Sequence, residues 1–346
     1  MNMMAQVGTR GELRRQSRIA RALGSPFVAA VLEAGDRQLH HAPQTNNLIQ
    51  GWPDDPSAAA LAMRFNAALH ALARRGDSPA LSALYQGAHR DFDGVIGQTL
   101  AAQDGFIARW MQTPTQTNEV ARAAAFAAAL MVLRRETGMP AELLEVGSSC
   151  GLNLNLARYA YDLGGTPAGD WDSSVRVRPE WRGMAPAAAP VEVVGARGVD
   201  LNPLDAGDAG ARARLLAFVW ADQPRRIERL KAALRLARTF RPRVDRADAI
   251  AWLPERLAEP QRSGVCRVVF HSMVLQYLGA ANRQAVIDAI DSAGAHATDE
   301  RPLARISFEW TPERDEVHLT LTRWPFGERR VLAICHPYGD WIDWRG

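Results

Sequence analysis

The sequence predicts a doubly wound α/β sheet that follows an all-helical segment. From residue 142 onward, apolar runs of strand length alternate with helical patterns, which is typical of a parallel sheet covered on both faces. Residues 1–138 read as helices only, rich in Ala, Leu and Arg, with almost no alternation of period two. We therefore expect a helical cap domain over 1–138 and an α/β domain over 139–346.

The helical segment leads directly into the first strand. Asn118 is a good N-cap for its last helix, and Gly138 with Pro140 ends that helix. No flexible linker follows, so we expect the helices to pack on the second domain as a cap. The expected helices cover 12–24, 25–33, 57–75, 79–88, 92–111 and 118–137.

The second domain is expected to hold five strands that alternate with helices and end in an antiparallel hairpin. An irregular insertion over 162–190, rich in Gly, Pro, Trp and Arg, interrupts it and is long enough to be functional. The expected strands cover 142–146, 198–201, 243–246, 265–270 and 303–310, the helices cover 211–240, 248–257 and 280–293, and the hairpin covers 316–337.

Composition excludes several classes of protein. The three cysteines of the 346-residue chain form no C-x-x-C pair, so we expect reduced thiols and no metal site. The longest uncharged apolar run, 123–133, is too short to span a bilayer, and the N-terminus lacks the apolar core of a secretory signal. The basic residues of 225–238 have no aromatic stacking pattern beside them, which favours a solvated face. We expect a cytoplasmic protein without a membrane or nucleic-acid partner, and its oligomeric state stays open.

The stretch 142–161 carries the strongest functional signal. An apolar strand ends there in a turn bracketed by Gly147 and Gly151, and Leu152 begins an expected helix. Such a turn directs the first N–H groups of the helix at a ligand above the strand.

Three chemistries use such a turn. A dinucleotide site has the pattern G-x-G-x-x-G, but Ser149 occupies its second glycine position. A nucleophile elbow has the pattern G-x-S-x-G, which Gly147, Ser149 and Gly151 match literally. That elbow, however, follows several earlier strands in hydrolases, and nothing upstream of residue 142 is predicted to be a strand.

The third pattern resembles the first motif of class I S-adenosylmethionine-dependent methyltransferases. Glu145, Gly147, Gly151 and Asn153 give E-x-G-x-x-x-G-x-N, with Ser149 at the position of the middle glycine. The resemblance implies a Rossmann-like sheet of the methyltransferase type with a C-terminal reversed hairpin. It also implies that these five residues bind S-adenosylmethionine.

The resemblance extends to the ends of later strands. It implies that Asp200 accepts hydrogen bonds from the ribose hydroxyls and that Asp248 lies near the adenine, and capping or turn formation would explain both acids as well. His271 and Tyr277 lie where the methyl group and its acceptor would meet, so they are the candidate catalytic residues. A buried structural histidine is the alternative for His271.

The polar run before the sheet completes the candidate site. Gln116, Asn118 and Glu119 are candidates for binding the acceptor, a small molecule, and helix capping is their alternative role. The strings QTNEVAR, LLEVGSSCGLNLNLARYAY, GVDLNPLD and FHSMVLQYL resemble a family of bacterial proteins known only as a domain of unknown function.

Two further hypotheses stay open. The first is a serine hydrolase in which Ser149 is the nucleophile, His271 or His336 the base, and Asp200 or Asp248 the acid. The second is a non-catalytic protein that keeps the fold in order to bind a macromolecule.

Overall fold

The computed structural model describes residues 11–53 and 55–346. The chain forms two compact units, one of Met1–Thr117 with Gly210–Ile227 and one of Asn118–Ala209 with Glu228–Gly346. The boundary therefore lies at residue 117 instead of the predicted 138, and the first unit takes a second segment from the predicted α/β domain.

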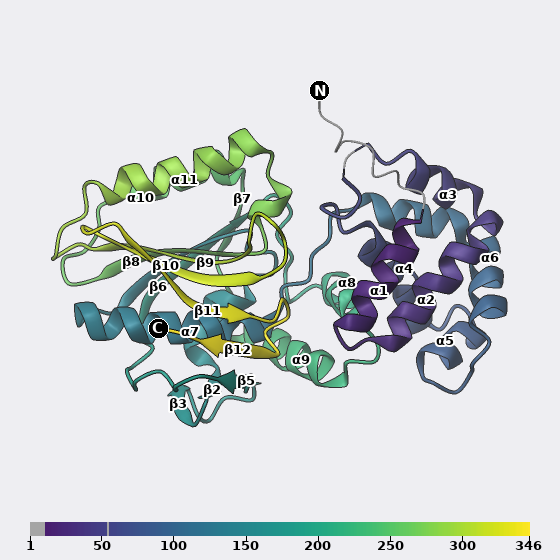
Figure 1. The fold of residues 1–346 in the computed structure, drawn as a ribbon, viewed down its shortest axis with the longest axis horizontal. Coiled ribbons are helices and arrows are strands. Elements are labelled where there is room, and N and C mark those ends of the chain that lie inside the picture. Colours follow the sequence, from purple (N-terminus) through teal and green to yellow (C-terminus); the bar gives the residue numbers. More distant parts are fainter. Residues whose placement is uncertain (1–10, 54) are drawn as a thin grey trace. The chain divides into compact units, whose positions relative to one another are not determined.

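The first unit is helical (Figure 1). Its described elements are α1 (Glu12–Ala22), α2 (Pro26–Gln38), η1 (Leu39–His41), α3 (Pro43–Gln50), α4 (Leu61–Arg75), α5 (Pro79–Tyr85), α6 (Phe92–Gln112) and α8 (Ala209–Phe218). Helix α3 was not predicted, and α2 extends five residues beyond its predicted end at residue 33.

Polar contacts explain why the segment after residue 209 belongs to the helical unit. The Ser25 hydroxyl donates to Asp222 Oδ1 at 2.6 Å, and the Phe27 amide donates to Asp222 Oδ2 at 3.1 Å. His70 on α4 is buried, and its Nδ1 lies 3.1 Å from the Ala217 carbonyl oxygen on α8. These bonds join residues far apart in sequence, which a local pattern does not reveal.

The second unit contains a nine-stranded, mostly parallel sheet in the order β5-β12-β11-β10-β9-β8-β1-β6-β7. Its strands are β1 (Ala141–Val146), β5 (Glu180–Arg182), β6 (Val193–Asp200), β7 (Val244–Arg246), β8 (Cys266–Ser272), β9 (Leu303–Trp310), β10 (Val317–Trp324), β11 (Glu328–Cys335) and β12 (Trp341–Trp344). The mixed α/β class is confirmed.

Strand β1 lies in the middle of the parallel part, where it pairs with β6 on one side and β8 on the other. The chain moves from β1 outward through β6 to β7, then crosses back to β8 and continues to β9. In open α/β sheets, ligands bind in the crevice beyond the carboxyl ends of the strands that flank such a reversal, and the strands at that position here are β1 and β8. Strands β9, β10, β11 and β12 then continue the sheet in antiparallel pairs, which confirms the predicted hairpin.

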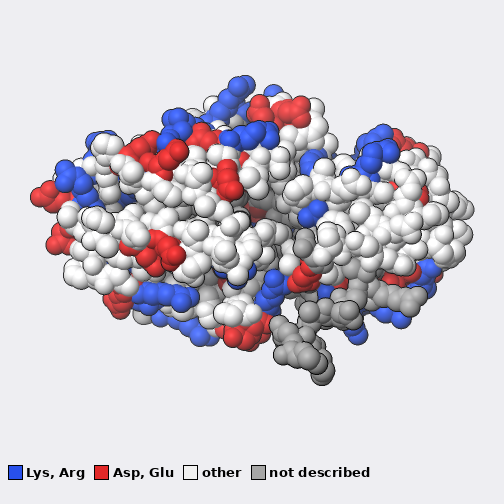
Figure 2. Space-filling model, turned by 90° about the horizontal axis from the view of Figure 1, so that it is seen from above, with Lys and Arg blue, Asp and Glu red and all other residues white. Residues whose placement is uncertain are grey.

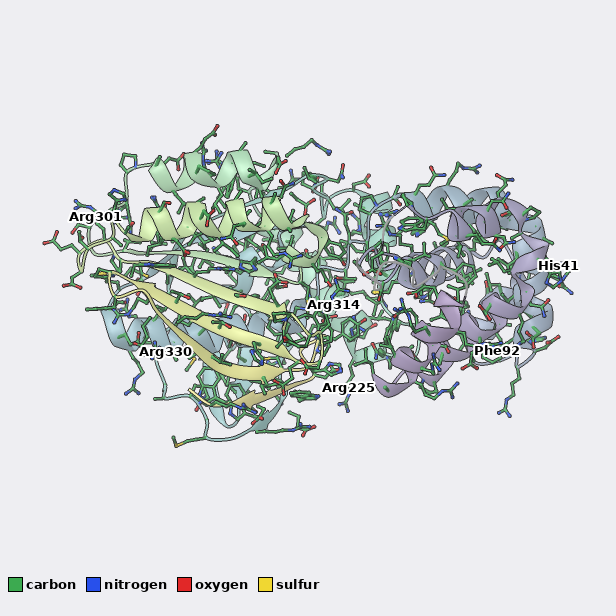
Figure 3. All side chains as sticks on the ribbon, turned by 45° about the horizontal axis from the view of Figure 1, so that its top comes forward. His41, Phe92, Arg225, Arg301, Arg314 and Arg330 are labelled. Atoms are coloured by element: carbon green, nitrogen blue, oxygen red, sulfur yellow. The ribbon has the colours of Figure 1, made fainter. Side chains whose placement is uncertain are left out.

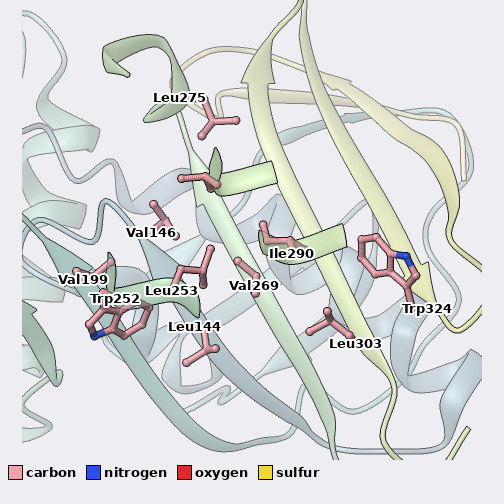
Figure 4. Packing of buried hydrophobic residues seen from close by; sticks show 11 residues of the cluster. Leu144, Val146, Val199, Trp252, Leu253, Val269, Leu275, Ile290, Leu303 and Trp324 are labelled. Carbon is pink, nitrogen blue, oxygen red and sulfur yellow. The ribbon is translucent and has the colours of Figure 1, made fainter. Parts of the chain in front are cut away.

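Helices cover both faces of this sheet. Helices α10 (Ala249–Ala258) and α11 (Ala280–Gly294) lie on one face and α7 (Ala123–Thr137) on the other (Figure 1). A buried cluster fills the space under α10 and α11, with Trp252 and Ile290 from the helices above Val269 of β8 (Figure 4). On the α7 side, Arg330 of β11 (labelled in Figure 3) donates to Glu136 Oε1 at 2.6 Å.

Two predicted helices begin or break differently in the structure. The predicted helix over 118–137 consists of the 3₁₀ helix η2 (Val120–Arg122) followed by α7. The predicted helix over 211–240 is divided into α8 and α9 (Pro224–Thr239), since proline at the first position favours a new helix start.

The prediction of a helix after the glycine turn was wrong. Leu152 begins a seven-residue 3₁₀ helix, η3 (Leu152–Arg158), and the chain then enters β2 (Ala160–Leu163). The Tyr161 hydroxyl donates to the Leu156 carbonyl oxygen at 2.7 Å, and the Tyr159 hydroxyl donates to that of Leu152. These hydroxyl groups donate to carbonyl oxygens that would accept backbone N–H groups in a longer helix. The predicted irregular insertion contains β3 (Thr166–Gly169), β4 (Arg176–Val177) and β5, of which β3 and β4 form a small sheet with β2.

Candidate functional site

The turn between β1 and η3, residues 147–151, is called the glycine loop below. Gly147, Ser149 and Gly151 have φ angles of 74°, 55° and 69°. A Cβ atom on Gly147 would lie 2.4 Å from Cγ2 of Val274, and one on Gly151 would lie 2.6 Å from Cβ of Pro242. Both glycines are therefore required by the backbone conformation and by close packing against neighbouring segments.

Protein acceptors take up the backbone N–H groups of the glycine loop. The Ser149 amide donates to Asp200 Oδ2 at 2.8 Å, and the Cys150 and Leu152 amides both donate to Asn118 Oδ1 at 3.2 Å. The Gly147 and Ser148 amides donate to the Val199 carbonyl oxygen at 2.9 and 3.0 Å. The loop therefore presents few donors to an anion, unlike a phosphate-binding loop.

Three buried side-chain oxygens around the glycine loop have no hydrogen-bond partner in the structure: Glu145 Oε2, Ser149 Oγ and Asn153 Oδ1. Their side chains come from residues that are 3%, 6% and 2% exposed. Glu145 and Asn153 are neighbours, because Asn153 Nδ2 donates to Glu145 Oε1 at 3.4 Å. Buried polar atoms normally have partners, so oxygens without one indicate a place where a ligand group or water binds.

The carboxyl group of Glu145 is also electrostatically unusual. Burial raises the pKa of Glu145 to about 8, although the hydrogen bond from Asn153 lowers it. The pKa shift follows from the cost of placing a charged carboxylate in the sheet interior without a cation. A positively charged ligand group beside Glu145 would remove that cost.

His271 is fully buried at the carboxyl end of β8, and both of its ring nitrogens are engaged. Arg305 Nε donates to His271 Nε2 at 3.1 Å, so Nε2 is the acceptor, and Nδ1 donates to Glu309 Oε1 at 2.7 Å. Burial lowers the pKa of His271, which keeps the ring neutral in this arrangement. The ring therefore joins β8 to β9, and neither nitrogen is left to deprotonate an acceptor.

Glu309 is a site residue that sequence reasoning missed. Its Oε1 accepts hydrogen bonds from the Val274 and Leu275 amides at 3.1 and 3.4 Å, in addition to that from His271. Glu309 thereby holds Val274 against Gly147, at the carboxyl ends of β1 and β8. Because Glu309 is near the end of β9, far along the chain, only its acidic character after an apolar strand could have drawn notice.

The remaining predicted site residues cap helices, lie at the surface or belong to the first unit. Glu119 caps η2 by accepting from the Ala121 amide at 3.1 Å, and Asp248 caps α10 by accepting from the Ile250 amide at 2.9 Å. Tyr277 ends the 3₁₀ helix η4 (Leu275–Tyr277) and is 48% exposed. Gln116 belongs to the first unit. The structure thus gathers Asn118, Glu145, Gly147, Ser149, Gly151, Asn153 and Asp200 around one loop.

Within residues 11–53 and 55–346, no candidate base is hydrogen-bonded to Ser149. The Ser149 hydroxyl has no hydrogen-bond partner, while His271 is committed to Glu309 and Arg305. His336 Nδ1 accepts from the Tyr338 amide at 3.3 Å and lies 3.4 Å from Asp340 Oδ2. A hydrolase requires a nucleophile within reach of its base, so this geometry offers the hydrolase hypothesis no support.

Two further properties concern the whole described chain. No group of three or more His, Cys, Asp and Glu side chains within 11–53 and 55–346 is arranged to hold a metal ion. Among the same residues, no helix combines the length and the apolar character needed to cross a bilayer. The Cys150, Cys266 and Cys335 thiols are all buried, and burial raises their pKa values.

Comparison with known proteins gives one family. A family model described as "Uncharacterized protein conserved in bacteria (DUF2332)" matches residues 10–344. No curated protein and no solved structure matches the chain.

Proposed function

We propose that the glycine loop of this chain, which belongs to the bacterial family DUF2332, binds S-adenosylmethionine for methyl transfer to a small molecule. The observation that carries this proposal is the set of buried oxygens without partners on Glu145, Ser149 and Asn153. They lie beside a loop whose own N–H groups are already bonded to Asn118 and Asp200.

This distribution of donors and acceptors selects the class of ligand. Two of the three oxygens without partners, Glu145 Oε2 and Asn153 Oδ1, are acceptors when Glu145 is ionised. A pyrophosphate brings only acceptors and would meet, among these three groups, no donor other than the Ser149 hydroxyl when Glu145 is ionised. S-adenosylmethionine brings an ammonium group and a positive sulfonium, which suit a buried carboxylate, and it has no phosphate.

The position of the loop supports the same proposal. Glu145 and Gly147 lie at the carboxyl end of β1, next to the crevice between β1 and β8, where ligands bind in open α/β sheets. Asp200 ends β6, and each carboxylate oxygen has a second lone pair for a ribose hydroxyl after accepting from the backbone. The hairpin after β9 places the antiparallel strand β10 beside β9, which resembles the reversed strand of methyltransferases, although no helix lies between β9 and β10.

The chemistry places few demands on the protein. When bound, the sulfonium would supply an electrophilic methyl group. The protein would hold that group in line with the acceptor, which can account for most of such a rate enhancement. Glu145 and Asn153 would bind the amino-acid end of the cofactor, Asp200 would bind its ribose, and Tyr277, 48% exposed on η4, would contact the acceptor. His271 would support the crevice through Glu309.

The proposal is tested by calorimetric titration of the full chain with S-adenosylmethionine, S-adenosylhomocysteine and, as a phosphate-bearing competitor, NAD. We expect binding of the first two and none of NAD. Glu145→Gln puts an NH₂ donor opposite the ammonium group and should weaken binding at least about tenfold, the loss of one charged hydrogen bond. Glu180→Gln, an exposed change on β5, should leave it unchanged. Tight binding of NAD, or equal affinity in Glu145→Gln and wild type, would contradict the proposal.

A further inference from the structure

A group of exposed arginines on the second unit has few acidic partners. Residues 235–244, RLARTFRPRV, contain four arginines and no acid, and Arg235, Arg238, Arg241 and Arg243 are all exposed. Among the described residues, only Arg243 of these four has an ion pair, a long one of 4.0 Å to Asp245. Over the face shown in Figure 2, by contrast, positive and negative side chains are interspersed.

A fifth arginine joins this group through an aromatic ring. The Arg158 guanidinium carbon on η3 lies 3.9 Å from the centroid of the Phe240 ring, and Phe240 is 42% exposed. Asn155 Nδ2 donates to the Phe240 carbonyl oxygen at 2.8 Å, which fixes η3 beside the end of α9. Phe240 stands between Arg238 and Arg241 in the sequence, but its contact with Arg158, 82 positions earlier, is visible only in the structure.

We infer that Arg158, Arg235, Arg238, Phe240, Arg241 and Arg243, together called the arginine face, bind single-stranded nucleic acid. Five guanidinium groups without strong ion pairs provide the positive surface that follows a phosphate backbone. The ring of Phe240 and the guanidinium plane of Arg158 provide a flat platform on which an unpaired base stacks. A base inside a duplex is not accessible to such a platform, so the single strand is favoured.

A helix dipole does not account for the arginine face. Only Arg238 lies in the last turn of α9, where a cation stabilises the helix C-terminus, while Arg241 and Arg243 lie beyond that helix. The arginine face also adjoins the glycine loop. A Cβ atom on Gly151 would lie 2.6 Å from Cβ of Pro242 and 2.7 Å from Cγ2 of Val244. The inference does not depend on the cofactor proposed for that loop.

The test is fluorescence anisotropy of a labelled 12-nucleotide oligothymidine with the full chain at rising salt. Five neutralised phosphates predict a slope of about −3.5 for log K against log salt, and about a hundredfold loss of affinity between 50 and 200 mM. Arg238→Gln with Arg241→Gln should reduce the slope to about −2.1. Phe240→Ala should weaken binding about tenfold and leave the slope unchanged.

The control is Arg178→Gln with Arg262→Gln, which removes the same charge from two exposed arginines outside the arginine face. It should change neither the affinity nor the slope. Failure of the folded wild type to bind at 50 mM salt would overturn the inference, as would equal weakening by the control pair. Equally tight binding of the matching duplex, or binding of phosphatidylglycerol vesicles without binding of the oligonucleotide, would overturn it too.

Discussion

Replacement of Gly147 by alanine tests whether packing or ligand access requires a glycine there. The new Cβ would lie 2.4 Å from Cγ2 and 2.9 Å from Cβ of Val274, in a residue with φ of 74°. The left-handed conformation costs about 1–2 kcal/mol for a residue other than glycine. Overpacking against Val274 costs a further 1–3 kcal/mol or so. We therefore expect Gly147→Ala to lower the free energy of unfolding by about 2–5 kcal/mol.

Two partner variants separate these contributions. Gly138→Ala, at φ of 70° with no atom within 4 Å of the new Cβ, measures the backbone cost alone. Val274→Ala removes the Cγ2 atom and leaves only the 2.9 Å contact, which a shift of a few tenths of an ångström relieves. The double variant Gly147→Ala with Val274→Ala should therefore be more stable than the sum of the single changes predicts, by about 1 kcal/mol or more.

Urea unfolding of the full chain, followed by tryptophan fluorescence, gives the required free energies. The reasoning is refuted if Gly147→Ala costs no more than Gly138→Ala, or if the changes at Gly147 and Val274 are additive. If the reasoning holds, loss of cofactor binding in a Gly147 variant would not identify a ligand contact, because the crevice itself would have changed.

Three other changes have defined outcomes. The pKa of buried His70 is lowered to about 4 from 6.5, so the unfolded chain binds an extra proton between these values. Stability should therefore fall by about 3 kcal/mol as the pH drops from 6.5 to 4, and denaturation of His70→Asn should show a correspondingly flatter pH profile. Because the pKa of Glu145 is about 8, binding of a cationic ligand beside it at pH 7 should release up to about one proton, measured calorimetrically in buffers of different ionisation enthalpy. Asn118→Ala leaves the Cys150 and Leu152 amides without an acceptor and should cost about 1–3 kcal/mol, with faster hydrogen exchange at those two amides, whereas unchanged exchange would contradict the bonding described.

The sequence predicted the sheet well where strands are long and apolar. The fifth predicted strand, 303–310, coincides with β9, and the fourth differs from β8 by one or two residues at each end. The hairpin of β10 and β11 was found from alternation and from its turn residues. These elements carry their signal locally, in period and composition.

The sequence failed where distant groups decide the local structure. Leu152, Leu154 and Leu156 recur at intervals of two, and Leu152 and Leu156 are also four positions apart, so their spacing does not by itself distinguish a helix from an extended segment. The longer helix does not form because the Tyr159 and Tyr161 hydroxyls bond carbonyl groups of this segment. A local sequence pattern does not reveal these hydrogen bonds.

The same distinction applies to the candidate site. A tight turn between a strand and a helix requires backbone conformations that glycine adopts readily, so Gly147 and Gly151 could be identified from the sequence. The acceptor role of Asn118 could not, because it depends on a φ of 41° and on bonds to amides more than 30 positions away. Glu309 was missed for the same reason.

The pairing of β5 with β12 has a consequence for how the protein is made. Strand β12 is the last strand of the sheet to be synthesised, yet its parallel neighbour is β5, with Trp341 opposite Glu180 and Asp343 opposite Arg182. During translation, residues 180–182 must wait for some 160 later residues before their partner exists. Until then, Trp181 and its neighbours are an unpaired segment open to chaperones and to misplaced partners. This edge of the sheet is thus completed only after β12 has been synthesised.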